Sequence, residues 1–214
     1  YMLAKQMFTN AYDNKLISEN PCPKMHAGGR DPVERQALTN EQMTTLIEAV
    51  KGTRAYVFCM IGLYSGLRRE EILGLKWDCV RLTGTPSILV KRACRFVHRR
   101  VIPIPPQLVQ CLQEAKASSK SCYVIGNEDN TPYTETQFRS MWDYVRNRTV
   151  GNKSYYRYRN GKKELYSFEA KLGEQAQNNP KVKYTIDFKV TPHILRHTYI
   201  TNLLLSGADV KTVQ

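Results

Sequence analysis

Residues 54–77 read RAYVFCMIGLYSGLRREEILGLKW, and this stretch decides how the middle of the chain folds. Residues 54–65 are apolar on nearly every side, which predicts a helix buried in the core of the protein. Gly66 follows them, and glycine commonly ends a helix. Residues 69–77 predict a further short helix. An arginine, Arg68, therefore lies at the junction of two core helices.

The charge of Arg68 needs a partner, because its neighbours Leu63, Leu67 and Ile72 are apolar. A charge in such surroundings must be paired or must face a cleft. Glu71 lies three residues further on and shares a helical face with Arg68, so one interpretation is an ion pair that ties down the helix end. The other interpretation is a functional arginine in a cleft. Taken alone, this stretch favours the ion pair.

Further helices and a small hairpin are indicated on both sides of this stretch. A capping box at Thr39 and Gln42 predicts one helix start, and a second capping box opens a helix over residues 134–148. Residues 107–117 also have helical periodicity. Segments 87–90 and 101–104 are rich in β-branched residues and predict a small hairpin.

The segment between residues 151 and 179 is polar, basic and rich in tyrosine. It contains Asn160-Gly161, a strong turn signal, so we predict an inserted hairpin or loop. Residues 183–190 then alternate between apolar and polar side chains, which predicts a strand. The next helix is expected to be capped by Thr191 and to end at Gly207.

The front of the chain forms a separate segment. Residues 1–19 carry apolar side chains at mostly helical spacing, and proline and glycine residues break the pattern after them. We expect a helix within residues 1–22, a linker over residues 23–34 and the main domain over residues 35–214. The first helix has no partner before it, and a further helix expected to be capped by Asp209 stops at Gln214 after barely a turn. We therefore expect the sequence to be cut at both ends.

Composition excludes several classes of protein. The chain has 214 residues, and 42% of them are hydrophobic, which is enough to form a core and excludes wholesale disorder. Its 32 Lys and Arg residues exceed the 19 Asp and Glu residues by 13, which indicates a polyanionic partner, with nucleic acid as the first choice. No apolar run reaches roughly 18 residues and no signal peptide is visible, so neither a membrane-spanning nor a secreted protein is expected.

The six cysteines do not form a metal-binding pattern. No CxxC motif is present, and no cysteine pairs with histidine at zinc-ligand spacing, so a zinc site is not expected. Several of them, Cys59 among them, lie inside apolar runs, where a reduced cysteine behaves as a small core residue. We predict reduced structural thiols in a cytosolic protein.

A second group of candidate functional residues lies in the sequence TPHILRH, residues 191–197. His193 and Arg196 are three residues apart and project side by side from the predicted helix. A cation near the start of a helix is opposed by the helix dipole, so Arg196 is poorly placed for stability and needs an anion nearby. A capping histidine beside a solvated arginine is the alternative, and this stretch alone does not decide between the two.

A third group lies in the predicted hairpin, where residues 91–100 read KRACRFVHRR. The segment has five cations and no carboxylate: Lys91, Arg92, Arg95, Arg99 and Arg100. A solvated basic edge is one interpretation. Contact with a phosphate backbone is the other, and the net charge of the chain favours it.

The order of Arg68, a basic hairpin and a His-x-x-Arg helix resembles the catalytic domain of the tyrosine recombinases, also called phage-type integrases. The resemblance covers about residues 33–214, and its specific parts are SGLR with Glu71 and LGL, RVIP at residues 100–103, PHxxRHT at residues 192–198, and Gly207-Ala208-Asp209. It implies an α+β fold that is mainly helical, with a small antiparallel sheet. Residues 12–21 look like the last helix of the family's core-binding domain. The basic, tyrosine-rich insertion is similar to that of conjugative-transposon integrases.

The resemblance also implies a chemistry. In this family a tyrosine attacks a DNA phosphodiester and forms a 3′-phosphotyrosyl bond, without metal or cofactor. Arg68 and Arg196 are then expected to hold the phosphate, His193 to assist as proton acceptor or hydrogen-bond donor, and Glu71 to orient the arginine. The family's general-acid lysine corresponds to Lys91, the only lysine of the hairpin, although the usual position falls near Cys94 or Arg95.

Partners follow from the same resemblance. We expect double-stranded DNA at attachment sites, self-association into a tetramer on that DNA, and a bacterial cytoplasmic, nucleoid-associated protein. A second histidine or tryptophan and the nucleophilic tyrosine are expected beyond Gln214, so residues 1–214 are predicted not to cleave DNA. A DNA-binding module of the same fold that never cleaves, or a type IB topoisomerase, is the alternative. The residues expected to contact DNA are Arg92, Arg95, Arg99, Arg100, Arg157 and Arg159.

Overall fold

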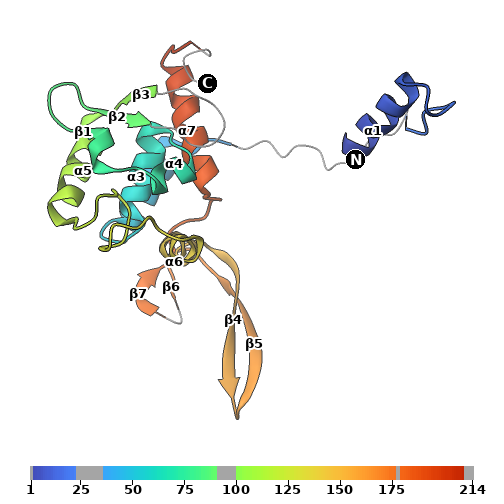
Figure 1. Ribbon diagram of the computed structural model, residues 1–214. Coiled ribbons are helices and arrows are strands. Elements are labelled where there is room, and N and C mark those ends of the chain that lie inside the picture. The colour runs from blue at the N-terminus through green and yellow to red at the C-terminus, as the bar shows by residue number, and fades with distance from the viewer. Residues whose placement is uncertain (1, 23–35, 91–99, 177–178, 210–214) are drawn as a thin grey trace. The chain divides into compact units, whose positions relative to one another are not determined.

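The computed structural model describes residues 2–22, 36–90, 100–176 and 179–209. The chain divides into two compact units, Tyr1–Glu34 and Arg35–Gln214. The first unit contains helix α1, Met2–Asp13 (Figure 1). All the other elements described below belong to the second unit, which contains the candidate site.

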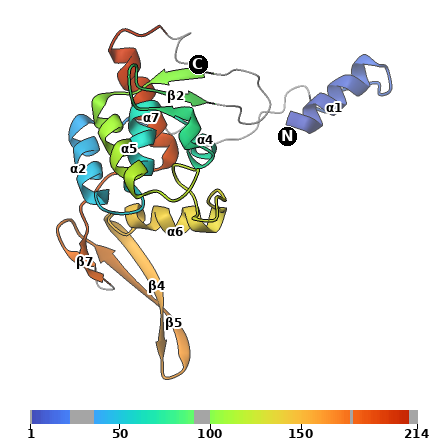
Figure 2. The same cartoon turned by 60° about the vertical axis from the view of Figure 1, so that its left-hand side comes forward.

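In the described part of the second unit, residues in helices outnumber those in strands (Figures 1 and 2). They are α2 (Asn40–Val50), α3 (Tyr56–Ser65), α4 (Arg69–Leu73), α5 (Pro106–Ser118), α6 (Glu135–Arg146) and α7 (Pro192–Leu205). Both predicted capping boxes are present, because Thr39 accepts from the backbone of Gln42 and Thr134 accepts from that of Gln137. Thr191 caps α7, as its sequence predicts.

Helix α3 is the centre of the core, as its apolar sequence predicts. It packs against α7, α5, α2 and α4. Gly62 lies close to α7, because a Cβ atom there would come within 3.0 Å of the side chain of Leu195. On the side of α6, the ring of Phe58 lies 5.3 Å from that of Phe138 and 5.6 Å from that of Trp142. These tilted and edge-to-face ring pairs are favourable geometries for aromatic packing.

A three-stranded antiparallel sheet lies beside the helices, formed by β1 (Val80–Arg81), β2 (Ser87–Val90) and β3 (Arg100–Pro103). Strands β2 and β3 are the predicted hairpin, whose connection, residues 91–99, lies outside the described residues. Val90 pairs with Arg100, and Leu89 pairs with Val101. Because neighbouring side chains in a strand alternate between faces, Arg100 is on the face of the sheet that buries Val90, and Val101 is on the other face.

The inserted segment forms a long two-stranded ribbon of β4 (Gly151–Arg159) and β5 (Lys162–Ala170). Asn160 and Gly161 connect the strands, and both have positive φ angles, of 48° and 76°, as a tight hairpin turn requires. Two shorter strands follow, β6 (Gln175–Ala176) and β7 (Asn179–Lys183). The ribbon extends away from the helices next to α6, on the side opposite the three-stranded sheet (Figures 1 and 2).

Three expected elements differ from the sequence prediction. The helix predicted over residues 69–77 ends at Leu73, and Trp77–Cys79 forms a short 3₁₀ helix instead. The backbone of Lys76 forms a bridge with that of Tyr123, a long-range pairing that ends the helical pattern early. The strand predicted over residues 183–190 is wrong, because β7 ends at Lys183 and only Ile186 pairs further on, with Thr149. In the first unit, α1 ends at Asp13 rather than near residue 19.

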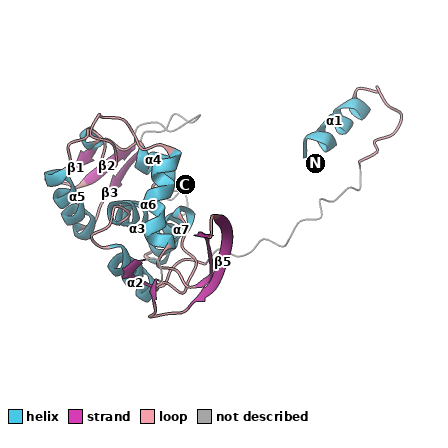
Figure 3. Ribbon diagram, turned by 90° about the horizontal axis from the view of Figure 1, so that it is seen from below, coloured by secondary structure: helices cyan, strands magenta, loops and turns pink. Residues whose placement is uncertain are grey.

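Figure 3, seen from below, shows the helices surrounding α3 and the separate ribbon. None of the helices in the described part of the chain is long and apolar enough to cross a membrane.

Candidate active site

A buried carboxylate, that of Glu71, organises the candidate site. Its side chain is only 3% exposed, and one of its oxygens, Oε2, accepts from Arg100 Nη2 at 2.6 Å. The same oxygen accepts from the backbone N–H of Arg68 at 2.8 Å. The guanidinium of Arg68 lies further away, with Nη1 3.5 Å from Oε1. These donors supply the partners that a buried polar group needs.

Arg68 is placed by the sharp turn between α3 and α4. Gly66 ends α3 in the left-handed conformation, with a φ angle of 61°, which glycine adopts at little cost. Arg68 then precedes α4, and its backbone N–H is satisfied by Glu71 from within that helix. Its side chain is 55% exposed, so the guanidinium is accessible from solvent. The ion pair inferred from the sequence is present, and it leaves most of the donors of Arg68 free to bind a ligand.

Arg196 reaches the same turn from α7. Its Nη1 donates a hydrogen bond to the backbone carbonyl of Gly66. One turn further along α7, the ring of Tyr199 lies against Gly66 so closely that a Cβ atom there would come within 2.2 Å of it. The turn between α3 and α4 is therefore fixed by α7 from two positions, and Arg196 is held at the same turn that leads into Arg68.

The electrostatics of Arg196 show that the arginines lie close together. Burial lowers the pKa of the Arg196 guanidinium, and the charges of Arg68 and Arg100 lower it further, while Glu71 opposes the shift. Arg68, just before α4, and Arg100 of β3 thus contact the carboxylate of Glu71, and Arg196 of α7 lies near enough for all three charges to act on it. This cluster has an excess of positive charge, which favours binding of a phosphate or another anion.

His193 lies in the first turn of α7 and is exposed. The pKa of the Glu70 carboxyl is lowered by a hydrogen bond from the backbone of Glu70 itself, and the charges of Arg69 and His193 add to this shift. His193 is therefore close to the first turn of α4, where Glu70 is located. His193 is also three residues before Arg196 on α7, so its exposed ring projects on the same side of the helix as that arginine.

The structure brings Arg68, Glu71, Arg100 and Arg196 together, with His193 beside them, from positions that are far apart in the sequence. Four residues expected in the basic hairpin lie outside the described residues: Lys91, Arg92, Arg95 and Arg99. The other two arginines expected to contact DNA, Arg157 and Arg159, lie on the ribbon and not in this cluster.

Arg157 makes contacts of its own within the ribbon. Its guanidinium lies 4.9 Å from the centre of the Tyr155 ring and 4.0 Å from that of the Tyr166 ring, and it donates to the hydroxyl of Tyr155. Such contacts between a cation and aromatic rings stabilise the ribbon. Arg159, next to the turn, is exposed.

Sequence reasoning did not find the residues that anchor α7. The backbone N–H of Leu38 donates to the Thr198 hydroxyl at 2.9 Å, and that hydroxyl donates to the carbonyl of Ile194 at 2.8 Å. Thr198 is fully buried, so this bond attaches the segment before α2 to the helix that carries Arg196. In the sequence, only the position of Thr198 on the apolar face of the predicted helix pointed to this bond.

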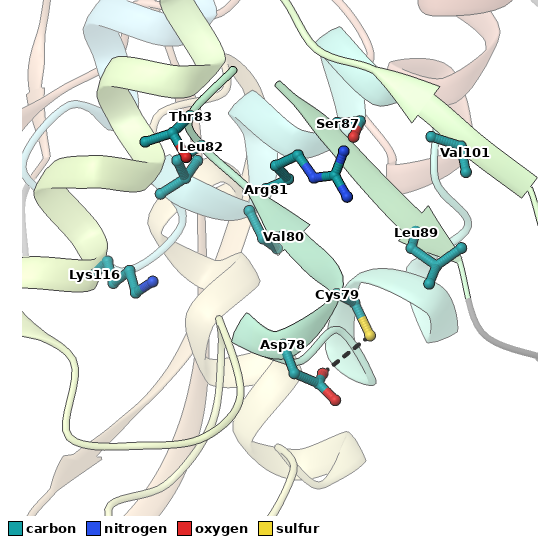
Figure 4. A pocket seen from close by; sticks show the side chains of 10 residues that line it. All are labelled: Asp78, Cys79, Val80, Arg81, Leu82, Thr83, Ser87, Leu89, Val101 and Lys116. Atoms are coloured by element: carbon teal, nitrogen blue, oxygen red, sulfur yellow. Dashed lines mark hydrogen bonds between the residues drawn. The ribbon is translucent and has the colours of Figure 1, made fainter. Parts of the chain in front are cut away.

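A pocket of about 520 Å³ lies next to the three-stranded sheet (Figure 4). Leu89 and Val101 line it, together with Arg81, Lys116 and other residues of the neighbouring elements. Leu89 and Val101 are on the face of the sheet opposite Arg100, so the pocket is separate from the arginine cluster. In the described part of the chain, no group of three or more His, Cys, Asp or Glu residues is placed to hold a metal ion.

Comparison with known proteins shows the family of the chain. Residues 36–160 match the model of the phage integrase family. The chain belongs to the phage integrase family. The matched segment includes the arginine and carboxylate of the α3–α4 turn, Arg68 and Glu71, and the β3 arginine, Arg100. The resemblance stated from the sequence is therefore confirmed.

Individual relatives are tyrosine recombinases. The chain is 26% identical to tyrosine recombinase XerA of Thermococcus kodakarensis over 186 residues, which cover 84% of this chain and 52% of that protein. It is 25% identical to a XerC-like tyrosine recombinase of Caldanaerobacter subterraneus, with 98% of this chain and 55% of that protein covered. The chain thus spans about half the length of these relatives.

Among solved structures, the chain resembles the Tn1549 transposon integrase in complex with circular intermediate DNA. The TM-score is 0.66 at 19% identity, and the match covers 98% of this chain and 66% of that one. This likeness confirms the expected fold, a mainly helical α+β tyrosine-recombinase catalytic domain with a small antiparallel sheet.

Proposed function

We propose that this member of the phage integrase family catalyses site-specific DNA strand exchange through a 3′-phosphotyrosyl intermediate. The observation that carries the proposal is the convergence of Arg68 and Arg196 on the Gly66 turn, next to a buried carboxylate. A tyrosine that attacks a phosphodiester without a metal needs positive charge from the protein. Two guanidiniums held on neighbouring elements supply that charge.

Arg68 and Arg196 bind the non-bridging oxygens of the scissile phosphate. A guanidinium presents planar pairs of N–H donors that match two phosphate oxygens, which a lysine ammonium does not. By analogy with other preorganised donors, each contributes roughly 3–4 kcal/mol to the stability of the transition state. His193, exposed beside the cluster, donates a hydrogen bond to the phosphate or accepts the proton of the attacking hydroxyl.

The reaction exchanges one phosphate ester for another. The bond between phosphorus and the tyrosine oxygen forms, and the bond to the 5′-oxygen of the next nucleotide breaks. The leaving oxygen takes a proton, which Lys91 of the basic hairpin supplies in this proposal. The reverse reaction on a second duplex restores the phosphodiester, so no cofactor is consumed.

The nucleophile is proposed to lie beyond Gln214. None of the thirteen tyrosines follows Tyr199 in the sequence. Tyr199 is close to Arg196, but burial raises the pKa of its hydroxyl, the opposite of what activates a nucleophile. Its ring is also fixed against Gly66. Tyr199 is therefore a packing residue in this proposal.

Double-stranded DNA is the proposed substrate. Strand exchange between two duplexes cuts four strands, so we propose a tetramer on DNA with one active site per strand. The basic hairpin contacts DNA through Arg92, Arg95, Arg99 and Lys91, and the ribbon contacts it through Arg159. Arg157 is expected to act mainly by stabilising the ribbon, because its guanidinium lies against two tyrosine rings.

The test is covalent capture. Duplexes are selected from a random pool by binding to the protein, and the selected sequence is rebuilt with a nick that traps the phosphotyrosyl intermediate. Under denaturing conditions, a longer protein that extends through the next tyrosine is expected to give a protein–DNA band, and residues 1–214 only free protein. An adduct from residues 1–214 would place the nucleophile within this chain and contradict the assignment beyond Gln214.

Matched variants give the test its controls. In the longer protein, Arg68→Lys is expected to lower cleavage at least about 100-fold while DNA affinity stays within a few-fold, because a point charge does not replace a planar pair of donors. Tyr199→Phe is expected to keep cleavage. Full cleavage by Arg68→Lys would remove Arg68 from the site. Exchange between two selected duplexes, compared with relaxation of a supercoiled plasmid, separates a recombinase from a topoisomerase, and failure of both reactions would indicate a module that only binds DNA.

A further inference from the structure

Arg100 makes the shortest ion pair of the cluster. Its Nη2 is 2.6 Å from Glu71 Oε2, whereas the guanidinium of Arg68 is 3.5 Å from Glu71 Oε1. The second close donor to Glu71 is the backbone N–H of Arg68, at 2.8 Å, and not its side chain. The carboxylate is thus neutralised mainly by Arg100, and the guanidinium of Arg68 remains 55% exposed.

The sheet fixes the position of Arg100. Arg100 is the first residue of β3 and pairs with Val90 of β2, which is buried. Its side chain therefore leaves the sheet on the core-facing side, toward α4 and Glu71. The side chain of Arg100 is 35% exposed, so it is more enclosed than that of Arg68.

We propose that Arg100 is a positioning residue, which satisfies Glu71 so that the guanidinium of Arg68 stays free to bind phosphate. This inference rests on the proposed function, because it assigns a role within the same phosphate site. It differs from a direct DNA contact by Arg100, the role expected from the sequence. Here Arg100 acts through Glu71 and Arg68.

The physical reason is the cost of an unpaired buried charge. Without Arg100, the buried carboxylate of Glu71 would lose its strongest partner, and Arg68 Nη1 is already within ion-pair distance. Arg68 would then turn its donors toward Glu71 and away from a bound phosphate. The cluster would also change from three cations and one anion to two cations and one anion.

The test uses residues 1–214 with inorganic phosphate as the probe, so it requires neither cleavage nor a known DNA site. Side-chain N–H signals of Arg68 and Arg196 are followed by NMR during a phosphate titration, with Arg68→Lys used to assign the Arg68 signal. In the unchanged protein, both signals are expected to shift with phosphate. In Arg100→Met, the Arg68 signal is expected to be displaced before phosphate is added, and phosphate affinity is expected to fall about tenfold, the loss of one charge-assisted hydrogen bond.

A double variant separates positioning from direct binding. Arg100→Met with Glu71→Gln removes the charge that would capture Arg68, and a glutamine oxygen still accepts from the backbone N–H of Arg68. The double variant is expected to restore both the Arg68 signal and the phosphate affinity. Failure to restore them would show that Arg100 binds phosphate itself, and an unchanged Arg68 signal in Arg100→Met would show that Arg68 is not captured. Either result overturns the proposal.

Controls separate this role from a structural one. Arg139→Met removes an arginine of α6 that pairs with Glu135 at 3.4 Å, and it is expected to change neither readout. Arg100→Lys keeps a cation for Glu71 and is expected to retain most of the phosphate affinity. If Arg100→Met does not fold, Arg100→Gln, which also removes the charge but keeps a polar side chain, replaces it with the same expected loss. Because covalent capture tests the proposed function on DNA, a failure there is distinct from a failure of this titration.

Discussion

Single residues in the core determine how the arginine cluster is supported. Gly66 is the clearest case, because its left-handed φ angle of 61° and the Tyr199 ring both act at one position. The carbonyl of Gly66 also accepts from Arg196. A change at Gly66 therefore affects backbone conformation, packing and the site together.

Gly66→Ala is expected to destabilise the protein more than the same change at Gly84. Both glycines have similar φ angles, 61° and 68°, but a Cβ atom at Gly84 has open space and one at Gly66 meets Tyr199. Placing an alanine in the left-handed conformation costs about 1 kcal/mol at each position, and overpacking against Tyr199 adds roughly 1–3 kcal/mol at Gly66 only. Urea unfolding of the two variants measures the difference. Equal losses would show that Tyr199 does not constrain this turn.

The buried thiol of Cys59 is expected to make the folded protein less stable at high pH. It is fully buried in α3, and burial raises the pKa of its thiol from 9.0 to about 12. The thiol stays neutral in the folded protein while it ionises in the unfolded chain above pH 9. Its contribution to stability is therefore complete below pH 9 and is lost as pH rises from there toward 12, by about 1.4 kcal/mol per pH unit.

Urea unfolding at pH 8, 9, 10 and 11 checks this prediction, with Cys59→Ala as the comparison. The variant is expected to be less stable at pH 8, because it removes core volume, and to lose less stability between pH 9 and 11. Cys111, whose pKa burial raises to about 11, contributes a similar slope in both proteins. Parallel curves for the two proteins would mean that the Cys59 thiol ionises while the protein is folded.

At the scale of elements, the β4–β5 ribbon is the part of the second unit that its core does not require. Tyr155, Tyr166 and Phe168 stack on one face of it, with ring centres 5.3–6.0 Å apart. Tyr156 and Leu165 pair on the other face and are exposed, as is Tyr158. The ribbon thus has its own aromatic stabilisation and carries cations at its far end.

Neutralising the end of the ribbon is expected to weaken binding to all DNA sequences. Arg159, Lys162 and Lys163 lie next to the turn, and if they contact phosphates, replacing all three by glutamine lowers the magnitude of the salt slope of log K by roughly 2–3. Binding to duplex DNA at several salt concentrations measures this. The matched control replaces Lys120, Arg139 and Arg146, which pair with carboxylates, and is expected to change the slope less. Equal changes in both triple variants would argue that the ribbon makes no phosphate contacts.

At the scale of the whole molecule, the core belongs to the second unit alone. Its cluster of buried apolar residues runs from Leu38 on the segment before α2 to Leu195 on α7. The first unit, Tyr1–Glu34, contains α1, on which Leu3 and Met7 are exposed. We therefore propose that residues 36–214 fold without the first unit, in keeping with the domain boundaries expected from the sequence.

A protein that starts at residue 36 is expected to unfold within about 2 °C of the full chain, since the core loses no buried residue. The beginning of α2 keeps its capping box in this protein, because Thr39 and Gln42 are retained. Thermal unfolding followed by circular dichroism checks the prediction. A Tm lower by 8 °C or more, roughly the effect of 2–4 kcal/mol in a domain of this size, would show that the first unit supports the fold.

Much of the fold could be predicted from the sequence by itself. The two capping boxes, the apolar helix that became α3 and the Asn160-Gly161 turn depend on residues close together in the chain, and the family resemblance depends on the order of such short motifs. Local hydrogen bonds and side-chain periodicity act over a few residues, so their patterns are readable without a structure. The candidate residues Arg68, Glu71, His193 and Arg196 were named on the same basis.

Only the tertiary structure decided how these residues are arranged. The bond from Arg196 to Gly66, the ion pair of Arg100 with Glu71 and the early end of α4 each join segments far apart in the sequence. Such contacts depend on how helices and strands pack, and a local pattern of residue types does not encode them. The sequence therefore determined which side chains are proposed to carry the chemistry. Only the folded chain brings Arg100 of β3 to Glu71 of α4, because a buried carboxylate needs a charged partner and that partner comes from a distant strand.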